Sequence, residues 1–130
     1  MKTTTVETSQ LSGPALDWAV AKSVAKENVK IEQCRGADAP AFCVVLTNGA
    51  HWTPSTDWTQ GGPLIERYCG ITNCEDEKQP EPFYAETRCS NLNGYANGTT
   101  ILIAVCRAIV AAELGDDVEV PVELLVEVGE

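Results

Sequence analysis

The sequence predicts a small α+β domain, in which two main helices and a shorter third helix pack on a small, mainly antiparallel sheet. Three observations indicate this class. The 130 residues are 44% hydrophobic and 22% charged, which is typical of one folded domain spanning residues 1–130. Apolar residues recur at helical spacing in two segments, and short β-branched runs end at turn residues elsewhere. Residues 1–10 and 125–130 are expected to be flexible ends.

The first main helix is expected to begin at the Ser12-Gly13-Pro14 turn, because proline suits the first helical turn and serine or glycine can cap it. Leu16, Val20 and Val24 follow at four-residue intervals and form a buried stripe. The helix should end near Asn28.

Two further helices are expected in the second half of the chain. Pro63–Tyr68 is predicted as a short helix that carries its proline in the first turn. The last helix spans Ile101–Leu114, with Thr99 or Thr100 as its N-cap and Gly115 just beyond its end.

Strands and loops account for the rest of the pattern. Ala41–Leu46 and Phe83–Thr87 are predicted as strands, because they are apolar or β-branched and end at turn residues. Residues 51–62, 75–82 and 91–98 are rich in glycine, proline, asparagine or acidic residues, and are expected to be loops and turns.

The net charge of −10, from nine basic and nineteen acidic residues, excludes a duplex nucleic acid as an expected partner. Residues 1–67 hold six bases and seven acids, whereas residues 68–130 hold three bases and twelve acids. An anion site would therefore use the first half together with Arg88 or Arg107. The acidic second half could alternatively contact a basic protein surface.

The chain contains neither an apolar stretch long enough to span a membrane nor an export signal, so it is expected in the cytoplasm. Free thiols are the default state of cysteine in that reducing compartment, and no paired zinc-binding spacing is present. We expect no metal and no cofactor. The six cysteines expected to be free are Cys34, Cys43, Cys69, Cys74, Cys89 and Cys106.

Catalytic motifs are missing from the sequence. It has one histidine, His51, and none of the glycine-rich, nucleophile-elbow or zinc-protease signatures. An enzyme would have to use His51 with Asp57 or a cysteine. We therefore expect a protein that is not an enzyme.

The segment around His51–Pro63 is the densest candidate binding site. It combines two flat aromatic rings, small hydroxyl groups and exposed backbone amides, a mixture that suits a nucleobase or a ribose phosphate. The alternative is a self-contained loop, in which Asp57 and Ser55 satisfy the backbone and Trp58 anchors it to the core. That structural role is favoured for Trp58, and both roles stay open for Trp52. The candidates are Trp52, Ser55, Thr56, Asp57, Trp58, Gln60, Gly61, Gly62 and, in the helix that follows, Arg67.

A second candidate site lies at the start of the last helix. Thr99 and Thr100 precede amides that attract an anion, and Arg107 returns to roughly the same face two turns later. The alternative is that Arg107 pairs with Glu66, Asp57 or a C-terminal acid, since an arginine in an apolar helix normally needs a carboxylate.

A third feature is a basic stripe on the first helix. Trp18, Lys22, Lys26 and Lys30 recur every four residues. The stripe either faces water or meets the acidic half of another subunit.

Three blocks of the sequence resemble one family. The blocks are residues 11–22, residues 54–67, which contain the run S-T-D-W-T-Q-G-G-P, and residues 108–121. They are similar to the NinX-like proteins of tailed bacteriophages and prophages, a domain of unknown function. The Gly98-Thr99-Thr100 run departs from the G-P-T-P-like entry towards which relatives tend. The resemblance implies a phage origin and the cytoplasm of an infected cell, without an established reaction.

The leading functional hypothesis is a non-catalytic sponge, which sequesters a nucleotide-derived immune signal such as a cyclic nucleotide or an ADP-ribose derivative. Stacking and a few charged hydrogen bonds in one open loop are too weak for tight binding, so a homo-oligomer with the small anionic ligand at its interface is expected. The alternative is an acidic inhibitor of a host enzyme or defence protein. A small signal-degrading enzyme is the third hypothesis.

Overall fold

The computed structural model describes residues 3–24, 29–33, 42–46, 49–74, 78–88 and 94–125. It confirms the α+β class. In these residues three helices pack with three small antiparallel sheets, one of three strands and two of two strands. None of the described helices has the length and apolarity that crossing a bilayer requires.

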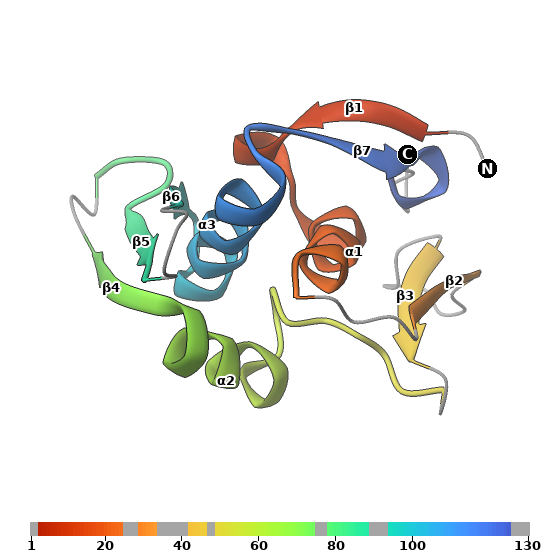
Figure 1. The fold of residues 1–130 in the computed structure, drawn as a ribbon, viewed down its shortest axis with the longest axis horizontal. Helices are drawn as coiled ribbons and strands as arrows, with labels where there is room; N and C mark the ends of the chain where they lie inside the picture. Colours follow the sequence, from red (N-terminus) through yellow and green to blue (C-terminus); the bar gives the residue numbers. More distant parts are fainter. Residues whose placement is uncertain are drawn as a thin grey trace.

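The helix α3 (Ile101–Leu114) runs through the middle of the molecule (Figure 1). It begins and ends where the sequence predicts. The Thr100 hydroxyl accepts a hydrogen bond from the Ile103 amide, and Gly115 ends the helix with a positive φ of 93°. Nine of its fourteen residues are buried, so α3 is the core around which the other elements pack.

The helix α1 (Gly13–Ser23) lies beside α3 and buries Leu16, Ala19 and Val20. It starts after Ser12, with a proline in its first turn, as expected. It ends at Ser23 rather than near Asn28, because Val24 has left the helical conformation. Residues 25–28, which include Lys26, lie outside the described residues.

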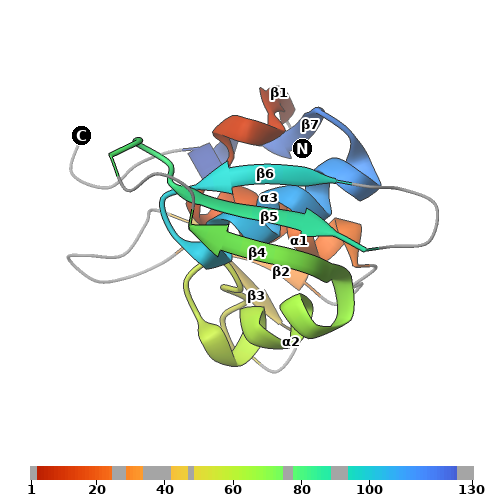
Figure 2. The same ribbon diagram turned by 90° about the vertical axis from the view of Figure 1, so that its left-hand side faces the viewer.

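The three-stranded sheet of β4 (Cys69–Cys74), β5 (Phe83–Thr87) and β6 (Tyr95–Gly98) covers another side of α3 (Figure 2). The strand β5 is where the sequence predicts one. The prediction of a turn over residues 91–98 is wrong for β6. The glycines that suggested a turn are there because a Cβ atom at Gly94 or Gly98 would overlap the backbone of α3.

Two two-stranded sheets complete the fold. The strand β1 (Thr3–Glu7) pairs with β7 (Asp117–Pro121), although residues 1–10 were expected to be a flexible end. The short helices η1 (Thr8–Gln10) and η2 (Val122–Leu125) follow these two strands. Residues 126–130 lie outside the described residues.

The second of these sheets pairs β2 (Val29–Gln33) with β3 (Phe42–Leu46). The strand β3 confirms the prediction of a strand ending at residue 46. The strand β2 corrects the basic stripe, because Lys30 lies in β2 and not on the first helix. Lys22 is exposed on α1, with its Nζ atom 5.3 Å from the centre of the Trp18 ring.

The helix α2 (Trp58–Tyr68) begins five residues before the predicted short helix, so residues 58–62 of the expected loop are helical. The cause is Asp57, whose carboxylate accepts a hydrogen bond from the Thr59 amide and caps the helix. Pro63 therefore lies inside α2 rather than in its first turn. Leu64 anchors the helix to the core.

Candidate functional site

The segment between β3 and α2 is attached to α1 by two of the predicted ligand-binding residues. Trp52 is 6% exposed, and its Nε1 donates to the backbone oxygen of Asp17 at 3.0 Å. Ser55 is buried, and its amide donates to the Asp17 carboxylate at 2.9 Å. Both residues therefore hold this loop in place. Of the two roles left open for Trp52, its burial and hydrogen bond favour the structural one.

Trp58 has the opposite environment from the one predicted. It is 58% exposed at the first position of α2, so it does not anchor the loop to the core. Trp52 occupies the core instead. Helical periodicity explains why Trp58 is exposed. Leu64 and Gly61 lie on the inward face of α2, and the ring of Trp58 projects from the start of the helix into solvent.

The polar residues of this segment mostly satisfy the segment itself, as the structural alternative proposed. The Asp57 carboxylate accepts from both the amide and the hydroxyl of Thr59, at 2.9 and 2.7 Å. The Gln60 side chain accepts from the Thr53 amide at 2.6 Å and donates to the His51 carbonyl at 2.8 Å. These groups are therefore committed to loop and cap hydrogen bonds.

The other candidates in this region have different surroundings. Gly61 is buried, and a Cβ atom there would overlap the Pro54 carbonyl and the Leu102 side chain, so close packing explains this glycine. Thr56 is exposed and Gly62 is half-buried. Arg67 is exposed, with its guanidinium 5.6 Å from the centre of the Tyr68 ring.

Arg107 is buried and bonded on several sides. Its Nε donates to the Leu11 carbonyl, and its Nη1 donates to the Asn97 carbonyl, both at 2.9 Å. The same Nη1 pairs with the Glu81 carboxylate at 2.5 Å. The alternative of a carboxylate partner is thus right, but the described partner is Glu81 rather than Glu66 or Asp57. Glu81 reaches Arg107 from the segment before β5, which local spacing could not predict.

Thr99 and Thr100 are exposed at the start of α3. The Thr100 hydroxyl is used by the helix cap. Arg107 is committed to three backbone and carboxylate oxygens, two turns away. The structure does not bring these three residues together around a hollow, because none of them lines either of the two hollows described below.

Asp17 is a buried carboxyl group that the sequence did not single out. It is 2% exposed, and burial raises its pKa from 3.8 to about 7, although hydrogen bonding with the side chain and the amide of Ser55 opposes part of the shift. Burial and the nearby Asp17 also raise the pKa of the Cys106 thiol. The signal for this buried acid in the sequence was the position of Asp17, directly after Leu16 in the apolar stripe of the first helix.

The cysteines correct one expectation. Cys43 is disulfide-bonded, so it is not a free thiol. Cys69, Cys74 and Cys106 are not in disulfides. Cys34 and Cys89 lie outside the described residues. Over the described part of the chain, no three histidine, cysteine or acidic side chains come together as a metal site.

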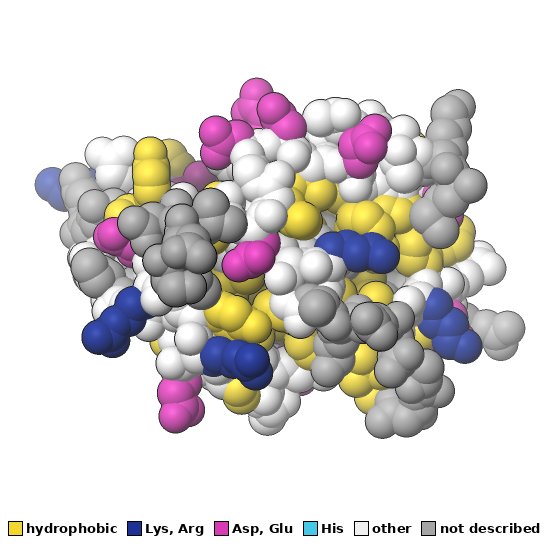
Figure 3. All heavy atoms as spheres, viewed as in Figure 1, with side chains coloured by type: hydrophobic (Ala, Val, Ile, Leu, Met, Phe, Trp, Pro, Cys, Tyr) yellow, Lys and Arg dark blue, Asp and Glu magenta, His cyan; other side chains and the backbone are white. Residues whose placement is uncertain are grey.

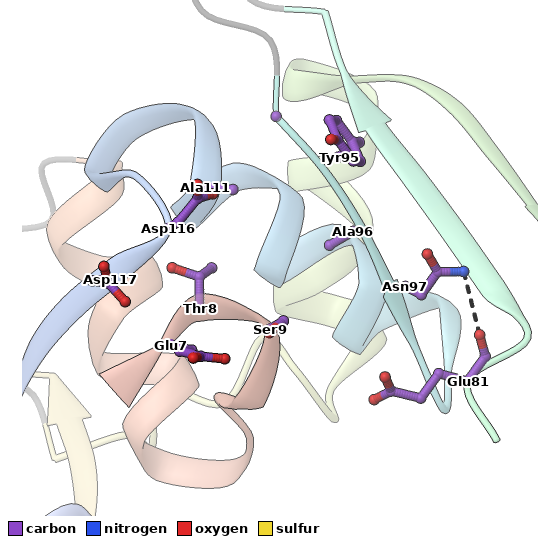
Figure 4. A pocket seen from close by; sticks show the side chains of 11 residues that line it. Glu7, Thr8, Ser9, Glu81, Tyr95, Ala96, Asn97, Ala111, Asp116 and Asp117 are labelled. Carbon is purple, nitrogen blue, oxygen red and sulfur yellow. Dashed lines mark hydrogen bonds between the residues drawn. The ribbon is translucent and has the colours of Figure 1, made fainter. Parts of the chain in front are cut away.

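A hollow lies between η1, the start of β7 and the outer edge of β6, with α3 behind it (Figure 4). Its volume is about 760 Å³, within the range of small-molecule pockets. We call it the acidic hollow. It is lined by Glu7, Thr8, Ser9, Glu81, Gly94, Tyr95, Ala96, Asn97, Ala111, Asp116 and Asp117. A smaller hollow beside it shares Glu81 and Asn97.

Among the residues that the structure describes, four carboxylates and no basic side chain line the acidic hollow. The Thr8 amide donates to the Asp116 carbonyl at 2.7 Å and its hydroxyl donates to the Gly115 carbonyl at 2.6 Å, which holds η1 against the start of β7. Glu7 and Asp117 are direct partners in the β1–β7 register. In Figure 3, acidic side chains gather at the top of the surface, where β1 and β7 lie in Figure 1. The acidic hollow therefore repels phosphate and attracts cations.

The remaining wall of the acidic hollow is aromatic and polar. Tyr95 is 69% exposed, and its ring centre lies 6.5 Å from that of Tyr84 on the neighbouring strand. Sequence reasoning missed this site because its residues come from separate segments that only the sheets and α3 bring together. The excess of acid in the second half of the chain was the available signal.

Comparison with known proteins agrees with the resemblance in the sequence. The family model described as Bacteriophage P22, NinX, matches residues 7–113, which include the hollow-lining residues as far as Ala111. No curated protein matches the chain.

Proposed function

The chain belongs to the bacteriophage P22 NinX family, and on this premise we propose that it is a non-catalytic phage protein that binds a basic segment of a host protein. The acidic hollow is the proposed binding site, and the cytoplasm of the infected cell is the proposed location. The observation that carries the proposal is the set of carboxylates around the hollow, whose described lining contains no lysine or arginine side chain. Masking or inhibiting the partner is the proposed outcome.

The hollow suits the side chain of a lysine or arginine. Glu81 is already paired with Arg107, which leaves Glu7, Asp116 and Asp117 to face a cation. A guanidinium or ammonium group donates to carboxylates in bonds roughly twice as strong as neutral ones. The exposed face of Tyr95 adds a surface on which a cation or an aliphatic stem can lie.

The cost of assembling these acids also supports a binding role. Glu7 and Asp117 are placed opposite each other on paired strands, where like charges destabilise a sheet. A cluster that lowers stability and lines a hollow is typical of a functional surface. The net charge of −10 would in addition steer a basic partner towards the chain.

The experiment compares two variants with equal net charge. One neutralises the hollow with Glu7→Gln, Asp116→Asn and Asp117→Asn. The control neutralises three exposed acids elsewhere, with Glu32→Gln, Glu66→Gln and Glu113→Gln. Host proteins captured by the wild-type chain are identified by mass spectrometry, purified and titrated by calorimetry against all three proteins.

We expect the hollow variant to lose at least about tenfold in affinity for the partner, and the control to lose far less. Affinity should also fall as salt is added. Equal losses in the two variants would mean that net charge alone attracts the partner. Unchanged affinity in the hollow variant would exclude the hollow as the binding site.

A second candidate function is the sequestration of a nucleotide-derived signal at the interface of a homo-oligomer. The specific observation in its favour is the exposed ring of Trp58, on which a base could stack. The protein would be incubated with cyclic nucleotides and ADP-ribose derivatives, then heated to release intact ligand for mass spectrometry. Retention that Trp58→Ala abolishes would support it. A monomeric mass together with no retained ligand would reject it.

A further inference from the structure

We propose that the partner binds as an extended strand, which adds to the outer edge of β6 and places a basic side chain in the acidic hollow. This inference rests on the proposed function, and it specifies the conformation of the bound segment. It is carried by a different observation, the backbone of β6, and not by the charges alone.

The strand β6 is the edge of the three-stranded sheet, whose order is β4-β5-β6. Its partner on one side is β5, with Glu86 opposite Tyr95 and Ala85 opposite Ala96. Its other side faces η1 across the acidic hollow (Figures 2 and 4). An edge strand next to a hollow is where a peptide can extend a sheet.

The hydrogen-bond pattern shows which groups face the hollow. The Thr87 amide donates to the Gly94 carbonyl at 2.8 Å, so this pair is bonded across the ladder. Bonded pairs alternate along an antiparallel ladder, so the Ala85–Ala96 pair is bonded and the Glu86–Tyr95 pair is not. The Tyr95 amide and carbonyl therefore point away from β5, towards the outer edge.

A contact of Arg107 supports the outward direction of the Tyr95 backbone groups and limits the length of β6 that an added strand can pair with. It donates to the Asn97 carbonyl at 2.9 Å, and Asn97 is two residues beyond Tyr95, on the same outer edge. The end of the edge at Asn97 is thus already occupied by the protein. An added strand would pair with Tyr95, beside the carboxylates, rather than along the whole of β6.

Charge complementarity identifies the occupant. A strand laid along this edge directs alternate side chains to one face. With Glu7, Asp116 and Asp117 across the hollow, those side chains must be lysine or arginine. A second copy of this chain is a poor occupant of the same edge, because it would bring its own carboxylates against these.

The probe is a short capped peptide of alternating valine and lysine, titrated into the labelled protein and followed by NMR and amide hydrogen exchange. Pairing should protect the Tyr95 amide by at least about tenfold at saturation. Tyr95→Pro removes the outward donor without touching a ladder bond to β5, and is expected to weaken binding about tenfold. The matched control Tyr95→Thr keeps the amide and should weaken binding much less.

The outcomes separate the two proposals. One outcome is that the peptide binds, the hollow variant abolishes this binding, and hydrogen exchange of the Tyr95 amide stays unchanged. Strand addition would then be wrong, whereas the acidic hollow would remain the proposed binding site. If the hollow variant binds the peptide as well as the wild type does, both proposals fail. If Tyr95→Pro does not fold, protection of the Tyr95 amide in the wild-type protein decides. Failure of the peptide to bind at any concentration overturns the strand-addition model.

Discussion

Arg107 and Asp17 are two charged or titratable residues that the fold buries in different ways. Arg107 has a carboxylate and two carbonyl oxygens around it. The Asp17 carboxylate accepts from the Ser55 amide, and burial raises its pKa to about 7. The arginine is therefore compensated as a charge, whereas the acid is stabilised mainly by staying protonated.

Replacement of Arg107 is expected to destabilise the fold rather than to remove a ligand. The Arg107→Ala substitution leaves the Leu11 and Asn97 carbonyls without their donor and Glu81 without its partner. The free energy of unfolding should fall by about 3 kcal/mol, as for other broken buried pairs. Urea denaturation measures this loss. Glu81→Gln, which keeps an acceptor at the half-exposed end, should cost far less, and an equal cost would contradict this account.

Asp17→Asn tests the buried acid through the pH dependence of stability. Its pKa is raised in the folded state, from 3.8 to about 7, so folding retains the proton. This contribution is complete below pH 3.8 and is lost as pH rises through 7. From about pH 5.5 to about pH 8, wild-type stability should fall by about 2 kcal/mol relative to Asp17→Asn. Parallel curves for the two proteins in urea titrations would show that Asp17 does not hold this proton.

At the scale of the elements, local signals predicted the three helices and two of the seven described strands, β3 and β5, and missed the other five. The Thr100 cap, Gly115 and the apolar run between them were sufficient for α3, because a helix makes its hydrogen bonds within itself. The strands β1 and β6 depend on partners far along the chain, so their polar and glycine-rich sequences suggested ends and turns. The segment after β3 was misjudged because the Asp57 cap was not recognised.

Gly94→Ala tests the close packing of β6 on α3. A Cβ atom at Gly94 would overlap the Ala108 carbonyl and the Ala112 amide, both of which belong to helix backbone and cannot move aside. We expect a loss of about 2 kcal/mol or more in the free energy of unfolding. Gly62→Ala is the matched control, because the space around this α2 glycine is open apart from one Trp58 carbon at 3.9 Å. It should be neutral or stabilise the helix by up to about 1 kcal/mol. Similar losses in thermal or urea unfolding would contradict the packing argument.

At the scale of the whole molecule, the distribution of charge was predictable and the site was not. The sequence indicated that acid is concentrated in the second half and that an acidic face could meet a basic protein. The hollow, however, is formed by Glu7 and Thr8 from the first strand and its continuation, and by residues of β6 and β7. The β1–β7 pairing and the packing of β6 on α3 bring these segments together, and short-range spacing carries no signal for either.

We expect the acids of the acidic hollow to lower the stability of the fold while they favour binding of a basic partner. Glu7 and Asp117 are paired across β1 and β7, so neutralising one with Glu7→Gln removes a like-charge contact. The free energy of unfolding should rise by about 0.5 kcal/mol, and the gain should shrink as salt is added. The control is Glu119→Gln on β7, where the residue faces Thr5 and its replacement should change stability little. The same Glu7→Gln protein should bind the basic partner more weakly. If Glu7→Gln neither stabilises the fold nor weakens binding, then these acids are ordinary surface charges, and the hollow is not a preferred binding site for a cation.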